Sequence, residues 1–144
     1  MSDPTQIDFY QIGKPGLDAG RLACRLALMA WERGHSITIL AETDEAAAGL
    51  DELLWEAPQG RFLPHGPAGT ESGDRAPVRI ARPDGLKDAD VVINLCAQPV
   101  TGTDRFNRVL EIVPHRREDR GAARDKYRYY QEQGLDPAYH EINR

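Results

Sequence analysis

The stretch DADVVINLC, residues 88–96, decides the fold of this chain. Its apolar run is continuous and does not alternate with polar residues. A strand with one solvated face alternates apolar and polar side chains, whereas a strand covered on both faces reads as one apolar run. The stretch therefore predicts a central, fully buried strand of a parallel sheet.

Other strands and helices alternate around this central strand. Short β-rich runs predict further strands at residues 8–12, 36–40, 76–81 and 108–114. Apolar periodicity and end signals predict helices at residues 17–34, from the Thr43 cap to near Trp55, and at 116–133. Alternating strands and helices are typical of an α/β domain. We expect one domain over residues 1–144, a three-layer sandwich with a mainly parallel sheet and helices on both faces.

Two segments carry weaker signals. Residues 56–77 are rich in Gly and Pro, and they predict a long loop with one short extended piece at RFLPH, residues 61–65. The tail LDPAYHEINR, residues 135–144, is expected to be weakly structured.

Composition limits the classes of function. The chain has 144 residues, with 18 Lys and Arg against 23 Asp and Glu, a net charge of −5. This acidic balance argues against a general nucleic-acid binder. Cys24 and Cys96 lie in apolar surroundings and form no CxxC pair, which is typical of thiols in a reducing compartment. Residues 1–8 lack an apolar signal core, and we expect a cytoplasmic protein.

The turn after the first predicted strand, GKPGLDAG at 13–20, invites a dinucleotide-binding interpretation. Its glycines do not follow the GxGxxG spacing, and no GK[ST] occurs. Cys96 ends a strand without a recognisable His or acidic partner, and the four histidines are scattered. We therefore expect no phosphate loop, no catalytic residues, no metal site and no cofactor.

The last predicted helix gathers positive charge in an acidic protein. Residues 116–134 contain six cations and four acids, so the segment is +2 and the remainder is −7. At 100° per residue, one narrow stripe is formed by Arg117, Arg120, Arg124 and Arg128. Tyr127 borders this stripe, whereas Ala123 and Tyr130 face the predicted core.

Two interpretations of this stripe are open. Exposed arginines are common, and cations late in a helix interact favourably with its dipole. Alternatively, guanidinium groups beside aromatic surface suit a ligand with carboxylates and an apolar side chain, because Arg grips a carboxylate through two parallel hydrogen bonds. A second apolar group surrounds the Gly- and Pro-rich turn and comprises Trp55, Phe62, Leu63 and Pro64. Either Trp55 and Phe62 close the core beneath the loop, or the group forms an exposed patch for a partner.

Several of these stretches resemble one known family, the chi subunit of bacterial DNA polymerase III. The resemblance runs nearly end to end, and its most specific parts are LWEAPQGRFLPH at 54–65 and VPHRREDRGAARDKYRYYQEQG at 113–134. It implies a non-catalytic α/β accessory subunit of the polymerase III holoenzyme, with a nucleotide-binding-like fold. Such a subunit bridges the clamp loader, through the psi subunit, to the acidic C-terminal tail of single-stranded DNA-binding protein.

The resemblance also implies two binding sites. The tail site comprises Val113, Arg120, Arg124, Tyr127 and Arg128. The psi site comprises Trp55, Phe62 and Pro64. Two alternatives stay open: direct binding of single-stranded DNA through the basic, Tyr-rich last helix, and a nucleotide-dependent enzyme on the α/β fold.

Overall fold

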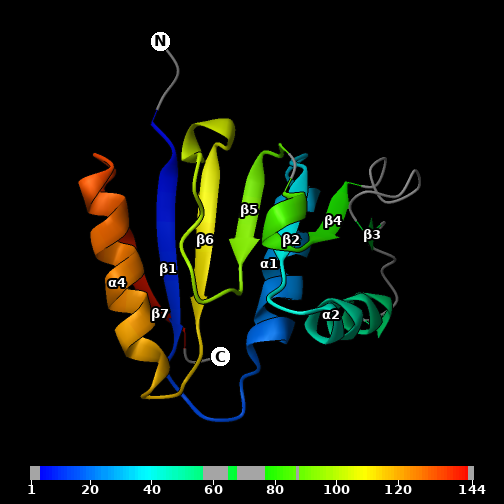
Figure 1. The fold of residues 1–144 in the computed structure, drawn as a ribbon. Coiled ribbons are helices and arrows are strands. Elements are labelled where there is room, and N and C mark those ends of the chain that lie inside the picture. Colours follow the sequence, from blue (N-terminus) through cyan, green and yellow to red (C-terminus); the bar gives the residue numbers. More distant parts are fainter. Residues whose placement is uncertain (1–3, 57–64, 68–76, 87, 143–144) are drawn as a thin grey trace.

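The computed structural model describes residues 4–56, 65–67, 77–86 and 88–142. Over these residues seven strands form one sheet in the order β3-β4-β2-β5-β6-β1-β7 (Figure 1). Every neighbouring pair in this sheet is parallel. The strands are β1 (Gln6–Ile12), β2 (Ile37–Leu40), β3 (His65–Pro67), β4 (Val78–Ala81), β5 (Val91–Asn94), β6 (Arg108–Val113) and β7 (Ala138–Ile142).

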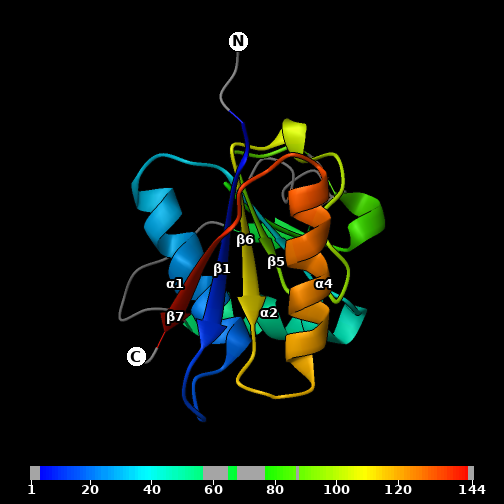
Figure 2. The ribbon, with the colours of Figure 1, turned by 90° about the vertical axis from the view of Figure 1, so that its left-hand side faces the viewer.

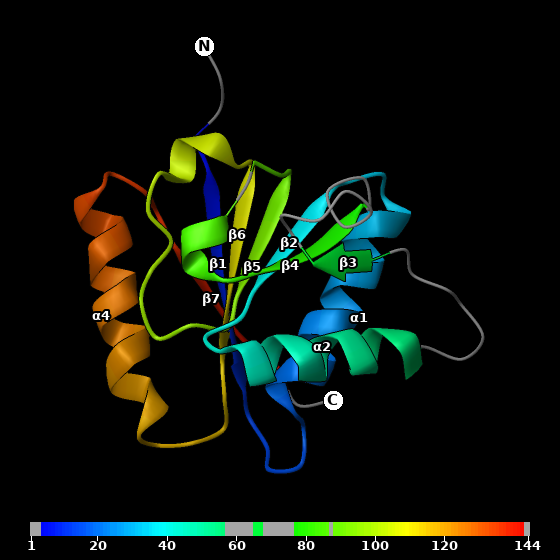
Figure 3. The same cartoon turned by 45° about the vertical axis from the view of Figure 1, so that its right-hand side comes forward.

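Helices cover both faces of the sheet, as the sequence predicted. The helix α1 (Ala19–Glu32) lies on one face and α4 (Asp119–Glu132) on the other, which is clear when the molecule is viewed from the β7 edge (Figure 2). The helix α2 (Asp44–Glu56) packs beside α1 at the β3–β4 end of the sheet (Figure 3). The predicted three-layer α/β sandwich is confirmed.

Local signals in the sequence set the helix ends. The Asp18 carboxylate accepts a hydrogen bond from the Arg21 amide at 3.0 Å, and the Thr43 hydroxyl accepts one from the Ala46 amide at 3.0 Å. Such caps satisfy amide groups that have no partner inside the helix. Gly34 and Gly134 follow α1 and α4 with φ of 87° and 82°, a conformation that glycine adopts without steric cost.

The sheet separates two apolar cores because successive strand residues point to opposite faces. Ile7 and Phe9 of β1 belong to the core beneath α4, whereas Ile12 belongs to the core beneath α1 and α2. All four residues of β5 are buried, and β5 lies between β2 and β6. The prediction that residues 88–96 contain the central buried strand is confirmed.

The prediction of a weakly structured C-terminal tail is wrong. Residues 138–142 form β7, which pairs in parallel with β1 in a register that sets Tyr139 opposite Phe9. The sequence of β7 gives no strand signal because β7 lies at the edge of the sheet. Four of its five residues are exposed, so apolar and polar side chains do not alternate along it. Aromatic rings support the pairing on both faces, with Tyr139 stacked on Phe9 and His140 stacked on Tyr10.

The structure also differs from the prediction at the start of the last helix and within the long loop. Helix α4 begins at Asp119, three residues after the predicted start, so Arg117 lies in the turn before the helix. Within the predicted loop 56–77, residues 65–67 form β3, which pairs in parallel with β4. Most of the extended piece predicted at 61–65 lies outside the described residues.

Candidate interaction site

Helix α4 carries most of the residues of the predicted tail site, and its inner face anchors it to β6. Ala123 and Tyr130 are buried against the sheet, as predicted. Lys126, which sequence counting included in the positive segment, is buried with them. Its ammonium lies 2.8 Å from the Glu111 carboxylate and also donates to the Cys96 carbonyl. Lys126 therefore adds no accessible charge to the outer face of α4.

Glu111 is the centre of a buried polar network that joins α4 to the sheet. Besides the Lys126 ammonium, its carboxylate accepts hydrogen bonds from the Tyr130 hydroxyl at 2.6 Å and the Asn94 amide at 2.9 Å. Burial raises the pKa of Glu111, while the Lys126 charge and the three hydrogen bonds act in the opposite direction. The Tyr130 hydroxyl also accepts from the Val100 amide at 2.8 Å. Such a satisfied network holds α4 in one position.

The outer face of α4 presents an arginine row, Arg120, Arg124 and Arg128, and all three residues are exposed. Within the described part of the chain, none of the three side chains forms an ion pair or a hydrogen bond. Arg116, just before the helix, instead lies 3.2 Å from the Asp119 carboxylate. The row thus offers guanidinium donors that the described acids do not neutralise.

The apolar members of the predicted tail site differ in exposure. Tyr127 is half-buried, its ring centroid is 5.5 Å from that of Phe9, and its hydroxyl donates to the Pro137 carbonyl at 3.0 Å. Val113 ends β6 and is only 4% exposed, so its side chain belongs mainly to the core. Tyr127 therefore stands beside the arginine row at the surface, whereas Val113 belongs to the core on the α4 side of the sheet.

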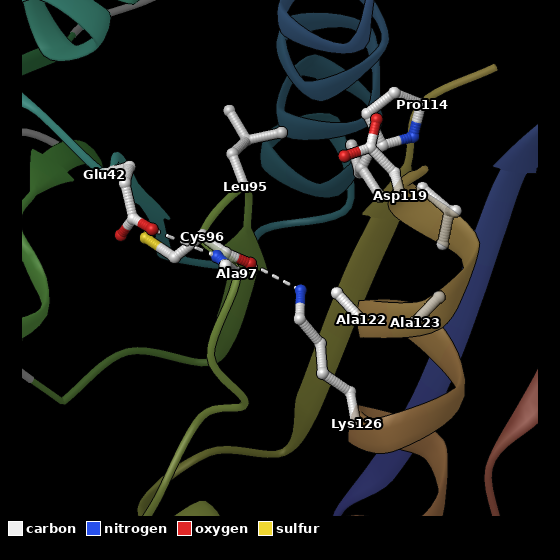
Figure 4. Close-up of a pocket in the computed structure, with 11 residues that line it drawn as sticks. Glu42, Leu95, Cys96, Ala97, Pro114, Asp119, Ala122, Ala123 and Lys126 are labelled. Carbon is white, nitrogen blue, oxygen red and sulfur yellow. Dashed lines mark hydrogen bonds between the residues drawn. The ribbon is translucent and has the colours of Figure 1, made fainter. Parts of the chain in front are cut away.

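A crevice of about 200 Å³ lies between α4 and the carboxyl ends of β5 and β6, where open α/β sheets bind ligands (Figure 4). Its walls include the acids Glu42 and Asp119, and its lysine, Lys126, is already paired with Glu111. The Ala97 amide donates to the Glu42 carboxylate at 3.3 Å. Burial, together with Glu42, raises the pKa of the Cys96 thiol to about 12. The crevice is thus poorly suited to a phosphate or to a thiolate nucleophile.

The predicted psi site is described only in part. Trp55 stands near the end of α2, is 62% exposed, and its ring lies 5.0 Å from that of His65. Phe62 and Pro64 lie outside the described residues.

The described residues offer neither a metal site nor a membrane-spanning helix. No group of three or more His, Cys, Asp and Glu side chains that could hold a metal ion occurs among them. Their helices include none that is both long enough and apolar enough to cross a membrane.

Two features of this region were not predicted from the sequence: the burial of Lys126 and the position of Tyr139 beside α4. The burial of Lys126 had an available signal, since it lies three residues after Ala123 and four before Tyr130, on the same helix face. Tyr139 had none, because its position beside α4 depends on the pairing of β7 with β1.

Comparison with solved structures defines the class of fold. T4 UvsW matches with a TM-score of 0.71 and 9% identity, and S. cerevisiae Dbp5, bound to ADP and other partners, matches with a TM-score of 0.65 and 13% identity. The matches cover 96% and 97% of this chain but 42% of each of those chains. At such low identity the likeness shows the fold alone. The protein thus belongs to the class of α/β sandwiches with a parallel sheet, a fold that it shares with these structures.

Sequence comparison then gives the family. Residues 5–138 match the family described as DNA polymerase III chi subunit, HolC. The DNA polymerase III subunit chi of Pseudomonas aeruginosa is 33% identical over 143 residues, covering 97% of this chain and 99% of that protein. The Escherichia coli subunit is 31% identical, covering 81% and 80%. The chain belongs to the chi-subunit family of DNA polymerase III, a replication complex.

Proposed function

We propose that this chain is a non-catalytic bridging subunit of the DNA polymerase III holoenzyme. One side binds the acidic C-terminal tail of single-stranded DNA-binding protein, and the other binds the psi subunit of the clamp loader. The observation that carries the proposal is the arginine row, which has no acidic partner among the described residues and stands beside Tyr127.

The tail site works by charge and by apolar contact. Arg124 grips the terminal carboxylate of the tail through paired hydrogen bonds, while Arg120 and Arg128 attract its acidic residues. Tyr127 and Val113 border the position of the last apolar side chain. The Lys126–Glu111 pair beneath them holds α4 in place, so little order has to be gained on binding.

The psi site lies away from the tail site. Trp55 belongs to α2, and α2 and α4 stand at opposite ends of the molecule (Figures 1 and 3). Phe62 and Pro64 complete this proposed site from outside the described residues. Because the two sites share no residue, both partners can bind one molecule at the same time, as a bridge requires.

The experiment is calorimetry with a short synthetic Asp-rich peptide that ends in an apolar residue. We expect binding in about the micromolar range, because the contact area is small. Arg124→Ala should weaken it about tenfold through loss of a charge-assisted pair. Amidation of the peptide C-terminus should remove most of the dependence on Arg124.

Arg21→Ala is the matched control, since it removes an exposed arginine from α1 on the opposite face of the sheet. Equal binding by the Arg124 and Arg21 variants at low salt would exclude the proposed tail site. A parallel titration with a single-stranded oligonucleotide tests direct DNA binding. Tyr130 is fully buried and Tyr127 and Tyr129 are half-buried, so we expect the peptide to bind more tightly than the oligonucleotide.

A further inference from the structure

The pairing of β7 with β1 brings an unpredicted aromatic side chain to the α4 side of the sheet. Tyr139 is 47% exposed, and its ring centroid lies 5.7 Å from Phe9 and 6.4 Å from Tyr127. Phe9 itself is fully buried. Tyr127 of α4 and Tyr139 of β7 thus rest on one buried ring and form a continuous aromatic ledge, the name used below for these two side chains.

Both ledge hydroxyls are used inside the protein. The Tyr139 hydroxyl donates to the Gln11 side chain at 2.5 Å, and the Tyr127 hydroxyl donates to the Pro137 carbonyl at 3.0 Å. These bonds restrain the two rings and leave their carbon surfaces as the groups that a partner can contact. A restrained aromatic ring offers a large apolar contact area at a small cost in conformational entropy.

The ledge adjoins the positive charge of the arginine row. On α4, Tyr127 lies three residues after Arg124 and one residue before Arg128. Burial raises the pKa of Tyr139, and the charge of Arg120 acts to lower it. Within the described chain Arg120 has no acidic partner of its own. Aromatic surface beside an unpaired guanidinium complements a peptide end that carries an apolar side chain next to a carboxylate.

We propose that Tyr139 is a specificity-determining residue of the tail site and that the ledge receives the last apolar side chain of the acidic tail. Val113 is only 4% exposed and offers little surface, whereas almost half of Tyr139 is accessible. Selectivity for the last side chain therefore resides mainly on the C-terminal strand. This inference rests on the tail binding proposed above and adds a residue from a different element.

A double-mutant cycle tests the contact directly. Two Asp-rich peptides, one ending in Phe and one in Ala, are titrated into the wild-type protein and into Tyr139→Thr. Thr keeps the strand preference of the edge position. With the wild type we expect the Phe-to-Ala change in the peptide to weaken binding about tenfold, and with Tyr139→Thr only about twofold. Tyr139→Phe should stay within about twofold of the wild type, because the ring surface is what the peptide contacts.

Met29→Ala provides the matched control, since Met29 is 46% exposed but belongs to α1 on the other face. A Phe-to-Ala effect of the same size in the wild type and in Tyr139→Thr would overturn the role of Tyr139 while leaving tail binding intact. No binding of either peptide to the wild type would overturn tail binding and this inference together.

A second measurement does not depend on the stability of any variant. Intermolecular nuclear Overhauser effects between the peptide Phe ring and the Tyr139 ring are expected in the wild-type complex. Effects to Tyr127 without any to Tyr139 would overturn the proposal even if Tyr139→Thr failed to fold.

Discussion

Replacing Lys126 with methionine removes the cation from the buried pair that anchors α4. The two side chains are 8% and 0% exposed, and the ammonium and carboxylate lie 2.8 Å apart. Methionine has a similar length and fits irregular space, so the main change is electrostatic. The Glu111 carboxylate keeps its hydrogen bonds from Tyr130 and Asn94 but loses its counter-charge.

The expected loss of stability follows from this geometry. Removing one partner of a buried ion pair typically costs about 3–5 kcal/mol, because the other charge stays in a poorly solvating interior. The Glu111 carboxylate still accepts two hydrogen bonds from neutral donors. We therefore expect Lys126→Met to lower the free energy of unfolding by about 3 kcal/mol, the lower limit of this range. For a domain of this size that corresponds to a fall in Tm of about 10 °C.

The loss should depend on pH. Burial raises the pKa of Glu111 in the folded protein, and loss of the Lys126 charge raises it further. An acid with a raised folded pKa favours folding below its unfolded pKa, about 4.3, and loses that contribution as pH rises through the folded pKa. Lys126→Met should therefore differ least from the wild type near about pH 4 and most near about pH 8.

Urea unfolding followed by circular dichroism measures both effects. The double variant Lys126→Met/Glu111→Gln should recover part of the loss, because a neutral amide needs no counter-charge. Arg128→Met, which changes an exposed cation on the same helix, should change stability by less than about 0.5 kcal/mol. A cost of less than about 1 kcal/mol for Lys126→Met, or a further loss of stability on adding Glu111→Gln, would show that the buried ion pair does not anchor α4.

Three further predictions concern other parts of the molecule. Burial acts to raise the pKa of Asp8, but hydrogen bonds from His140 and Arg108 outweigh this effect and hold the pKa below its usual range. Asp8→Asn should therefore lower the free energy of unfolding by about 1–3 kcal/mol near neutral pH. In urea unfolding the difference from the wild type should shrink as pH falls below about 4 through the lowered folded pKa, and a constant difference would contradict the assignment. Burial raises the pKa values of Cys24 and Cys96 to about 11 and about 12, so iodoacetamide should label both slowly in the native protein and rapidly in urea, as measured by mass spectrometry. Rapid native labelling would show that the thiols are accessible. Thr43→Ala should cost about 1 kcal/mol and Thr43→Ser much less, since only the hydroxyl cap of α2 is lost; equal stability of all three proteins would exclude the cap.

Much of the fold was predictable from short-range patterns. The apolar run at 88–96 indicated a central parallel strand, and β5 lies there with all four residues buried. The hydroxyl of Thr43 caps α2 as predicted, and the glycines at 34 and 134 follow the ends of α1 and α4. These signals are readable because they depend on groups a few residues apart in the chain.

Only the part of the candidate site that lies on α4 could be predicted from the sequence. Helical spacing set Arg120, Arg124 and Arg128 on one face, and all three are exposed. The same spacing could have shown that Lys126 turns inward, but only β6 could supply its partner, Glu111. Whether a cation on a helix is free or neutralised depends on a neighbour from another element, which periodicity does not report.

The amino-acid sequence by itself determined the α/β class, the buried central strand and the arginine row, because each follows from backbone periodicity or from local capping. Tertiary structure alone decided the strand order, the pairing of Lys126 with Glu111, and the use of residues 138–142 as an edge strand. The physical reason is distance along the chain. Tyr139 comes to Phe9 through hydrogen bonds between strands about 130 residues apart, and no local propensity specifies which free edge a short strand will join.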